Sequence, residues 1–167
     1  MEGFGMKRPH QFLRWLIAVI AVMVLAGCAS TPELVSHGFA FDFIDDSPEA
    51  ELLDYRYGTS YYGKSERQSL GRVSQGKGIF GEIRRGDDLY VKWRLKATGE
   101  VFEETIDLRN RLSKDIRGSE IYFLVRGPQL YVYLITPKKR AKDEPPNGPS
   151  KWSFRHILTI YPDSPKN

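Results

Sequence analysis

The sequence contains one cysteine in 167 residues, and this scarcity limits its chemistry. A single thiol cannot form an intramolecular disulfide, and it cannot build a cysteine-based zinc site. The three histidines lie far apart in the sequence, which leaves little for a histidine-rich metal centre. The Gly-x-Ser-x-Gly signature of a serine nucleophile is also missing. We therefore expect no metal, no cofactor and no enzymatic activity.

The sequence also lacks a hydrophobic run long enough to cross a membrane. Its longest apolar stretch, Trp15 to Leu25, has about a dozen residues, whereas a spanning helix needs roughly 20. The basic residues Lys7, Arg8 and Arg14 precede it. A positive segment followed by a short apolar segment is typical of a secretory signal peptide.

The tetrapeptide Leu25-Ala26-Gly27-Cys28 directly follows the apolar run and resembles the lipobox of bacterial lipoproteins. The resemblance implies that the Cys28 sulfur receives a diacylglyceryl group, that the chain is cut between Gly27 and Cys28, and that the new amine is acylated. Residues 1–27 are then a helical lipoprotein signal peptide, residues 28–37 an acylated tether, and residues 38–167 a β-rich periplasmic domain.

The resemblance also implies a location. Ala29 follows the cysteine, and in Gram-negative lipoproteins the absence of Asp at this position favours export to the outer membrane rather than retention in the inner one. The expected site is the periplasmic side of the outer membrane. Removing the signal leaves 22 basic and 20 acidic residues, so the net charge falls from +4 to +2. Such a weak positive charge does not favour nucleic-acid binding.

Alternating apolar residues predict an all-β fold after the tether, either a small antiparallel β-sandwich or an open barrel of about six to eight strands. Residues 39–43 place three phenylalanines on one face, and alternation recurs over residues 51–57, 89–95 and 152–160. Residues 58–78 and 137–150 are rich in turn-forming and charged residues, and we expect loops there.

Two hairpins are predicted in the middle of the domain. A two-residue turn at Thr98-Gly99 would pair Leu95 with Phe102, although it also pairs Trp93 poorly with Glu104. A second turn at residues 127–128 would pair Phe123 with Val132 and Val125 with Leu130. The whole segment from Leu89 to Ile135 resembles uncharacterised proteobacterial lipoproteins with a similar double hairpin.

Other motifs favour structural roles. Residues 76–81 match the pattern Gly-x-Gly-x-x-Gly, but no helix follows to bind a nucleotide, so we expect a flexible turn before a strand. His37 falls in the expected tether, and His156 falls on the apolar side of the last strand. The adjacent carboxylates at 45–46 and 87–88 would point to opposite faces of a strand, so neither pair forms an acid/base dyad.

Tyrosine and arginine are enriched at protein interfaces, and they provide the candidate binding surface. The candidate partner-binding residues are Tyr55, Arg56, Tyr57, Tyr61, Tyr62, Tyr122, Tyr131 and Tyr133. We expect a non-enzymatic lipoprotein whose β-domain binds a protein. Its layout is similar to that of immunity lipoproteins that neutralise type VI secreted phospholipases, which implies a secreted effector as the partner. The alternative is an envelope-assembly or cell-wall module that binds glycan or lipid through its aromatic residues and the basic residues Lys92, Arg94 and Lys96.

Overall fold

The computed structural model describes residues 34–59, 71 and 73–163, and these residues form eight strands and one short 3-10 turn. The strands are β1 (Leu34–Asp42), β2 (Ala50–Tyr57), β3 (Gly76–Arg84), β4 (Asp88–Leu95), β5 (Val101–Asp107), β6 (Glu120–Arg126), β7 (Gln129–Lys139) and β8 (Arg155–Tyr161), and the 3-10 turn η1 (Ser150–Trp152) precedes β8. The predicted all-β fold is confirmed.

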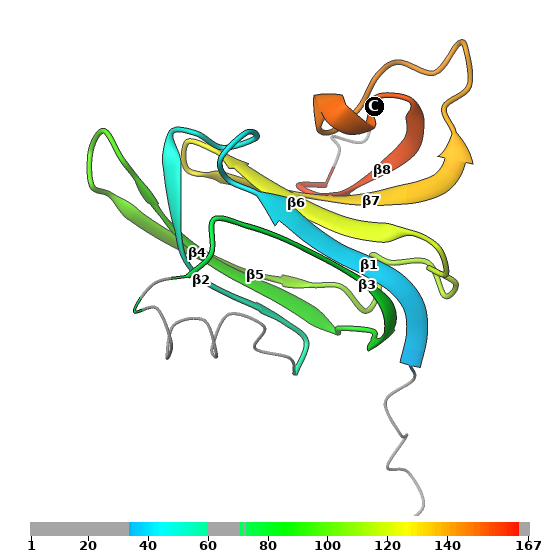
Figure 1. Ribbon diagram of the computed structural model, residues 1–167, viewed down its shortest axis with the longest axis horizontal. Coiled ribbons are helices and arrows are strands. Elements are labelled where there is room, and N and C mark those ends of the chain that lie inside the picture. The colour runs from blue at the N-terminus through cyan, green and yellow to red at the C-terminus, as the bar shows by residue number, and fades with distance from the viewer. Residues whose placement is uncertain (1–33, 60–70, 72, 164–167) are drawn as a thin grey trace, which may run out of the picture. The chain divides into compact units, whose positions relative to one another are not determined.

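The strands form two sheets, as in a β-sandwich (Figure 1). One sheet has five strands in the order β3-β1-β6-β7-β8, and the other has three in the order β2-β4-β5. The neighbouring strands are antiparallel, as expected, except that β1 and β6 are parallel. Parallel neighbours require a long connection, and here the chain passes through the second sheet between them.

The main core lies between the two sheets and is built from the phenylalanines of β1 and the turn after it. Phe39, Phe41 and Phe43 are all buried, as their alternation predicts. The Phe41 ring lies 4.7 Å from the Tyr55 ring of β2 and 4.9 Å from the Phe123 ring of β6. These contacts join strands of both sheets, so the alternating phenylalanines pack at the interface between the sheets.

The register of one predicted hairpin is confirmed and that of the other is wrong. In β6–β7, Phe123 pairs with Val132 and Val125 with Leu130, as expected. In β4–β5, Trp93 pairs with Phe102 instead of Glu104. The turn is longer than two residues, and the Trp93 and Phe102 rings stack with centroids 5.7 Å apart. The structure thus avoids the poor pair of the shorter turn.

Pairing of β1 with β3 corrects two further expectations. Strand β1 begins at Leu34, so residues 34–37 belong to the sheet and not to the tether. His37 is fully buried, with Nδ1 2.8 Å from the Val35 carbonyl oxygen and Nε2 2.9 Å from the Tyr57 hydroxyl. The glycine-rich residues 76–81 are part of edge strand β3 and not a flexible turn. Neither feature has a local sequence signal, because both depend on this long-range pairing.

Candidate binding pocket on the outer face of the five-stranded sheet

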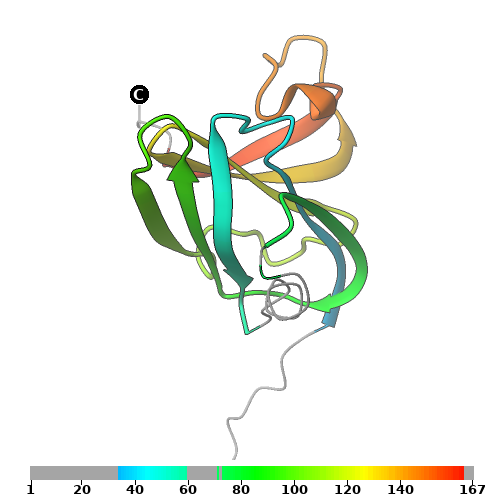
Figure 2. The same cartoon turned by 60° about the vertical axis from the view of Figure 1, so that its left-hand side comes forward.

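The five-stranded sheet has a second apolar cluster on its outer face, the face turned away from the three-stranded sheet. The buried members of the cluster are Ala40, Tyr122, Leu124, Tyr133, Ile135 and Ile157, with Tyr131 and Trp152 packed against them. Residues 140–154, here called the β7–β8 connection, lie over this face (Figures 1 and 2). The outer face is therefore partly covered by its own chain.

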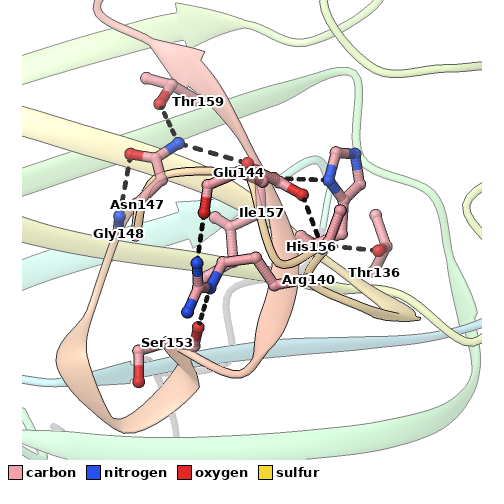
Figure 3. A network of polar contacts seen from close by, with 10 residues as sticks. Thr136, Arg140, Glu144, Asn147, Gly148, Ser153, His156, Ile157 and Thr159 are labelled. Carbon is pink, nitrogen blue, oxygen red and sulfur yellow. Dashed lines mark hydrogen bonds and ion pairs between the residues drawn. The ribbon is translucent and has the colours of Figure 1, made fainter.

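Polar contacts link parts of the β7–β8 connection to one another and hold it to β8 (Figure 3). Arg140 donates from Nε to the Ser153 carbonyl oxygen at 2.7 Å and from Nη1 to the carbonyl oxygen of Glu144. The Glu144 carboxylate lies 2.7 Å from His156 Nδ1, and Asn147 Nδ2 donates to Thr159 Oγ1 at 3.0 Å. The connection is mostly exposed, as predicted, and these contacts fix its path.

Lys151 fixes the η1 turn to the end of β1. Its Nζ lies 3.2 Å from Asp42 Oδ2 and 3.1 Å from Asp46 Oδ2, and it sits 4.8 Å from the centre of the Tyr122 ring. The Tyr122 hydroxyl donates to Asp46 Oδ2 at 2.5 Å. Burial and the Asp46 carboxylate raise the pKa of Tyr122, so this hydroxyl keeps its proton. The same anchor positions the next residue, Trp152.

Strand register places four residues in one row across the outer face. Phe80 of β3 pairs with Gly38 of β1, Gly38 pairs with Glu120 of β6, and Glu120 pairs with Ile135 of β7. A Cβ atom at position 38 would lie 2.9 Å from Glu120 Cγ, closer than carbon atoms approach without a shift. Glycine at this position therefore leaves the space that the Glu120 side chain occupies.

This row and the β7–β8 connection enclose a pocket of about 310 Å³. Its lining residues are Phe80, Gly118, Glu120, Ile135, Thr136, Pro137, Trp152 and Arg155. Phe80 is 63% exposed, and Phe154, whose ring lies 6.1 Å from that of Trp152, is 54% exposed. The pocket thus combines a carboxylate, an indole and a guanidinium with exposed aromatic surface beside it.

Two polar atoms of the lining residues lack hydrogen-bond partners among the residues the structure describes. They are Glu120 Oε1 and the Trp152 indole N–H, and both are buried. Burial raises the pKa of Glu120, and the charge of Lys151 opposes that rise. An unsatisfied buried polar group costs on the order of 1–3 kcal/mol, so such a group in a native fold calls for an explanation. A ligand group that completes these bonds would provide one.

Arg155 is the cation among the lining residues. Its Nη1 donates to the Pro137 carbonyl oxygen at 2.6 Å, and its guanidinium carbon lies 5.3 Å from the centre of the Phe154 ring. These contacts fix the guanidinium within the wall of the pocket. Within the described ranges, Glu120 forms no ion pair with it.

Four of the five predicted partner-binding tyrosines that the structure describes are buried. Tyr55 and Tyr57 lie in the main core, and Tyr122 and Tyr133 are buried under the β7–β8 connection. Alternation placed Tyr122 and Tyr133 on the face opposite the main core, but it gave no sign that the connection would cover that face. Because all four are inaccessible in the folded domain, their assignment as interface residues is corrected.

The remaining predicted site residues have different positions. Arg56 is half-buried and forms an ion pair with Asp88, and Tyr131 is half-buried and stacks on Tyr133 with ring centres 6.4 Å apart. Gly27, Cys28, Tyr61 and Tyr62 lie outside the described residues.

The basic residues of the alternative hypothesis are paired within the three-stranded sheet. Lys92 lies 3.0 Å from Glu103, and Arg94 lies 3.4 Å from Glu51. Lys96 donates to the Pro48 carbonyl oxygen at 2.8 Å. Carboxylates therefore partly neutralise Lys92 and Arg94, which weakens their attraction for an anionic polymer, whereas Lys96 keeps its charge.

Sequence reasoning missed Phe80, Glu120, Trp152 and Arg155 as pocket residues. Their proximity depends on the parallel pairing of β1 with β6 and on the fold of the β7–β8 connection. The local alternation of apolar residues indicates neither this pairing nor the path of the connection. The one available signal was a charged residue, Glu120, at the start of a strongly apolar strand.

Two larger cavities, of about 490 and 420 Å³, are weaker candidates for a site. Gly71 and Val73 line the first and Leu34 lines the second, and these residues border segments that the structure does not describe. Neither cavity is lined by a buried polar atom without a partner among the described residues.

The described part of the chain contains no cluster of three or more His, Cys, Asp or Glu side chains that could hold a metal ion. A search of the same residues finds no helix with the length and apolar character needed to cross a membrane. The chain matches no protein-family model, no curated protein and no solved structure.

Proposed function

We propose that this protein is a lipid-anchored periplasmic lipoprotein whose β-domain binds a protein partner through the pocket on its outer face. The lipobox-like sequence ending at Cys28 supports the anchor. The observation that carries the binding role is the pair of unsatisfied polar groups, Glu120 Oε1 and the Trp152 indole N–H, in residues that line a pocket beside exposed aromatic rings.

The residue types of the pocket favour a protein as the ligand. Trp and Arg are enriched among the residues that dominate protein–protein binding energies, and aromatic side chains are enriched at such interfaces. Phe80 and Phe154 add exposed apolar area beside Trp152. The ion pairs of Lys92 with Glu103 and of Arg94 with Glu51 weaken the support for a glycan or lipid surface on the three-stranded sheet.

The partner we propose is a secreted effector hydrolase that acts in the periplasm, and binding would block its activity. Support for this finer assignment comes from the layout of the chain, which is similar to that of immunity lipoproteins in its lipobox, its size and its small β-rich domain. Affinity purification after cross-linking in cells tests it. Capture of one secreted hydrolase that loses its activity in the purified complex would support the proposal, whereas capture of envelope-assembly proteins or peptidoglycan would contradict it.

The anchor is tested separately by replacing the acylated residue. In Cys28→Ser cells we expect the domain in the soluble periplasmic fraction, because acyl chains hold lipoproteins on membranes at about 0.8 kcal/mol per buried methylene. Ser30→Ala is the control, since it keeps the cysteine and should stay with the membranes. Persistence of Cys28→Ser in the membrane fraction would contradict the anchor.

A further inference from the structure

We propose that the pocket receives a basic side chain, lysine or arginine, from the protein partner. This inference rests on the proposed function and names the chemistry by which the partner is recognised. Its basis is the Glu120 carboxylate, whose Oε1 is buried without a partner in the described residues. Lys151 is shared by two carboxylates, Asp42 and Asp46, and the nearby carboxylate of Glu120 has no ion-pair partner among the described residues.

The shape and composition of the pocket suit one long side chain. A volume of about 310 Å³ lies at the small end of ligand pockets, so it accommodates a side chain and not a folded element. Phe80 and Trp152 line it with aromatic surface, against which the methylenes of lysine or arginine pack and the cationic head interacts with the rings.

Glu120 provides the polar end of the site. Its Oε1 is covered and unsatisfied, so rotation of the carboxylate must bring an oxygen to the incoming cation. A charged donor to a carboxylate makes a shorter and stronger hydrogen bond than a neutral donor. The Trp152 indole N–H, also unsatisfied, would donate to a backbone carbonyl of the partner beside its basic residue.

Arg155 does not compete for this role. Its guanidinium is already bound to the Pro137 carbonyl and lies over Phe154. Arg155 keeps its positive charge, but no atom of its guanidinium is among the buried polar atoms that lack a partner in the described residues, whereas Glu120 Oε1 is. The acceptor that remains to be satisfied belongs to a carboxylate, and this favours a cationic donor over an acidic ligand.

The test uses the full chain, labelled with ¹⁵N-tryptophan, in detergent micelles. The probes are N-acetyl-arginine amide and N-acetyl-lysine amide, with N-acetyl-norleucine amide and N-acetyl-glutamate amide as uncharged and acidic controls. We expect the basic probes to shift the Trp152 indole signal saturably. The Trp93 indole, which donates to the Gly127 carbonyl in the main core at 3.0 Å, should not shift. The Trp152 indole signal is assigned as the one that disappears in Trp152→Phe.

The matched variants are Glu120→Gln and Glu103→Gln. We expect Glu120→Gln to weaken binding of both basic probes by about tenfold or more, because it removes the charge and keeps the shape. Glu103→Gln removes an exposed carboxylate from the other sheet and should bind like the original chain. An unchanged Trp93 indole signal shows that each variant is folded. Equal shifts with norleucine amide, tighter binding of glutamate amide, or unchanged binding by Glu120→Gln would overturn the inference.

The outcomes separate this inference from the proposed function. If cross-linking captures the same partner with the original chain and with Glu120→Gln in equal amounts, the protein-binding function stands and the basic-side-chain inference fails. If the basic probes bind through Glu120 but no protein is captured in cells, the site stands and the proposed function fails.

Discussion

Replacing Glu120 by glutamine should make the domain more stable although it weakens binding. The Glu120 carboxylate is half-buried and its Oε1 has no partner in the described structure. Desolvation penalises the charged form and raises the pKa of the group. Glutamine keeps the shape without the charge. Its amide still lacks a partner, but an unsatisfied charged group costs more than an unsatisfied neutral one, and for a partly buried side chain we expect a gain of about 1 kcal/mol at neutral pH.

The pH dependence of this gain follows from the direction of the shift. An acid whose pKa is raised on folding lowers stability as the pH rises past its unfolded pKa, and the loss is complete above its folded pKa. The advantage of Glu120→Gln should therefore be present near pH 7 and disappear as the pH falls to the ordinary glutamate value of 4.5, because Glu120 of the folded chain takes up its proton above that value. A binding site that reduces stability in this way is a common compromise between activity and stability.

Thermal unfolding of the full chain in micelles, followed by circular dichroism, measures this effect. For a domain of this size, about 1 kcal/mol corresponds to a rise in Tm of about 4 °C. Glu103→Gln is the control. The pKa of exposed Glu103 is lowered, mainly by Lys92 and to a smaller extent by Tyr90, so the folded domain favours its charged form. Removing that charge should therefore not raise Tm. A Glu120→Gln chain that melts below the original at neutral pH would refute the reasoning, because it would mean that the fold needs the charge.

Three further outcomes are expected. Burial lowers the pKa of His37 from its ordinary 6.5, and the hydrogen bond with the Val35 carbonyl opposes this shift. The free energy of unfolding in urea should therefore fall as the pH drops below about 6.5, and it should fall less in His37→Gln. Gly38→Ala should displace Glu120 and lower the free energy of unfolding by about 1–3 kcal/mol in the same assay. Gly78→Ala should lower it less, because its Cβ would lie 3.8 Å from that of Ala40, an ordinary contact distance. Ala29→Asp should move the lipoprotein from the outer-membrane to the inner-membrane fraction in density gradients; unchanged sorting would contradict the proposed export.

The alternation of apolar and polar residues in the sequence predicted those strands that bury a single face. The burial of Phe39, Phe41 and Phe43 followed from strict alternation. The β6–β7 hairpin followed from alternation and from a glycine suited to the turn, Gly127, which has a positive φ of 56°. The β4–β5 register was missed because it depends on the length of the turn, which Thr98-Gly99 left ambiguous, and on the stacking of Trp93 with Phe102.

The pocket was beyond local reasoning because its residues come from distant parts of the chain. Phe80 and Glu120 are 40 positions apart and are brought into one row by β1, which pairs with both of their strands. Trp152 joins them through the η1 turn, which Lys151 holds to Asp42. The prediction that Tyr122 binds a partner was wrong for the same reason. Tyr122 faces the predicted side of the sheet, but the β7–β8 connection, which lies far from it in the sequence, covers that side.

Site-specific photo-cross-linking in living cells tests the central claim most directly. A photoreactive phenylalanine at Phe80, at the pocket, is compared with one at Val101, which is 48% exposed on strand β5 of the other sheet. We expect a discrete adduct with one periplasmic protein from position 80 and not from position 101, and we expect Glu120→Gln to lose that adduct. Equal adducts from both positions, or adducts from position 101 alone, would contradict a partner-binding site at the pocket.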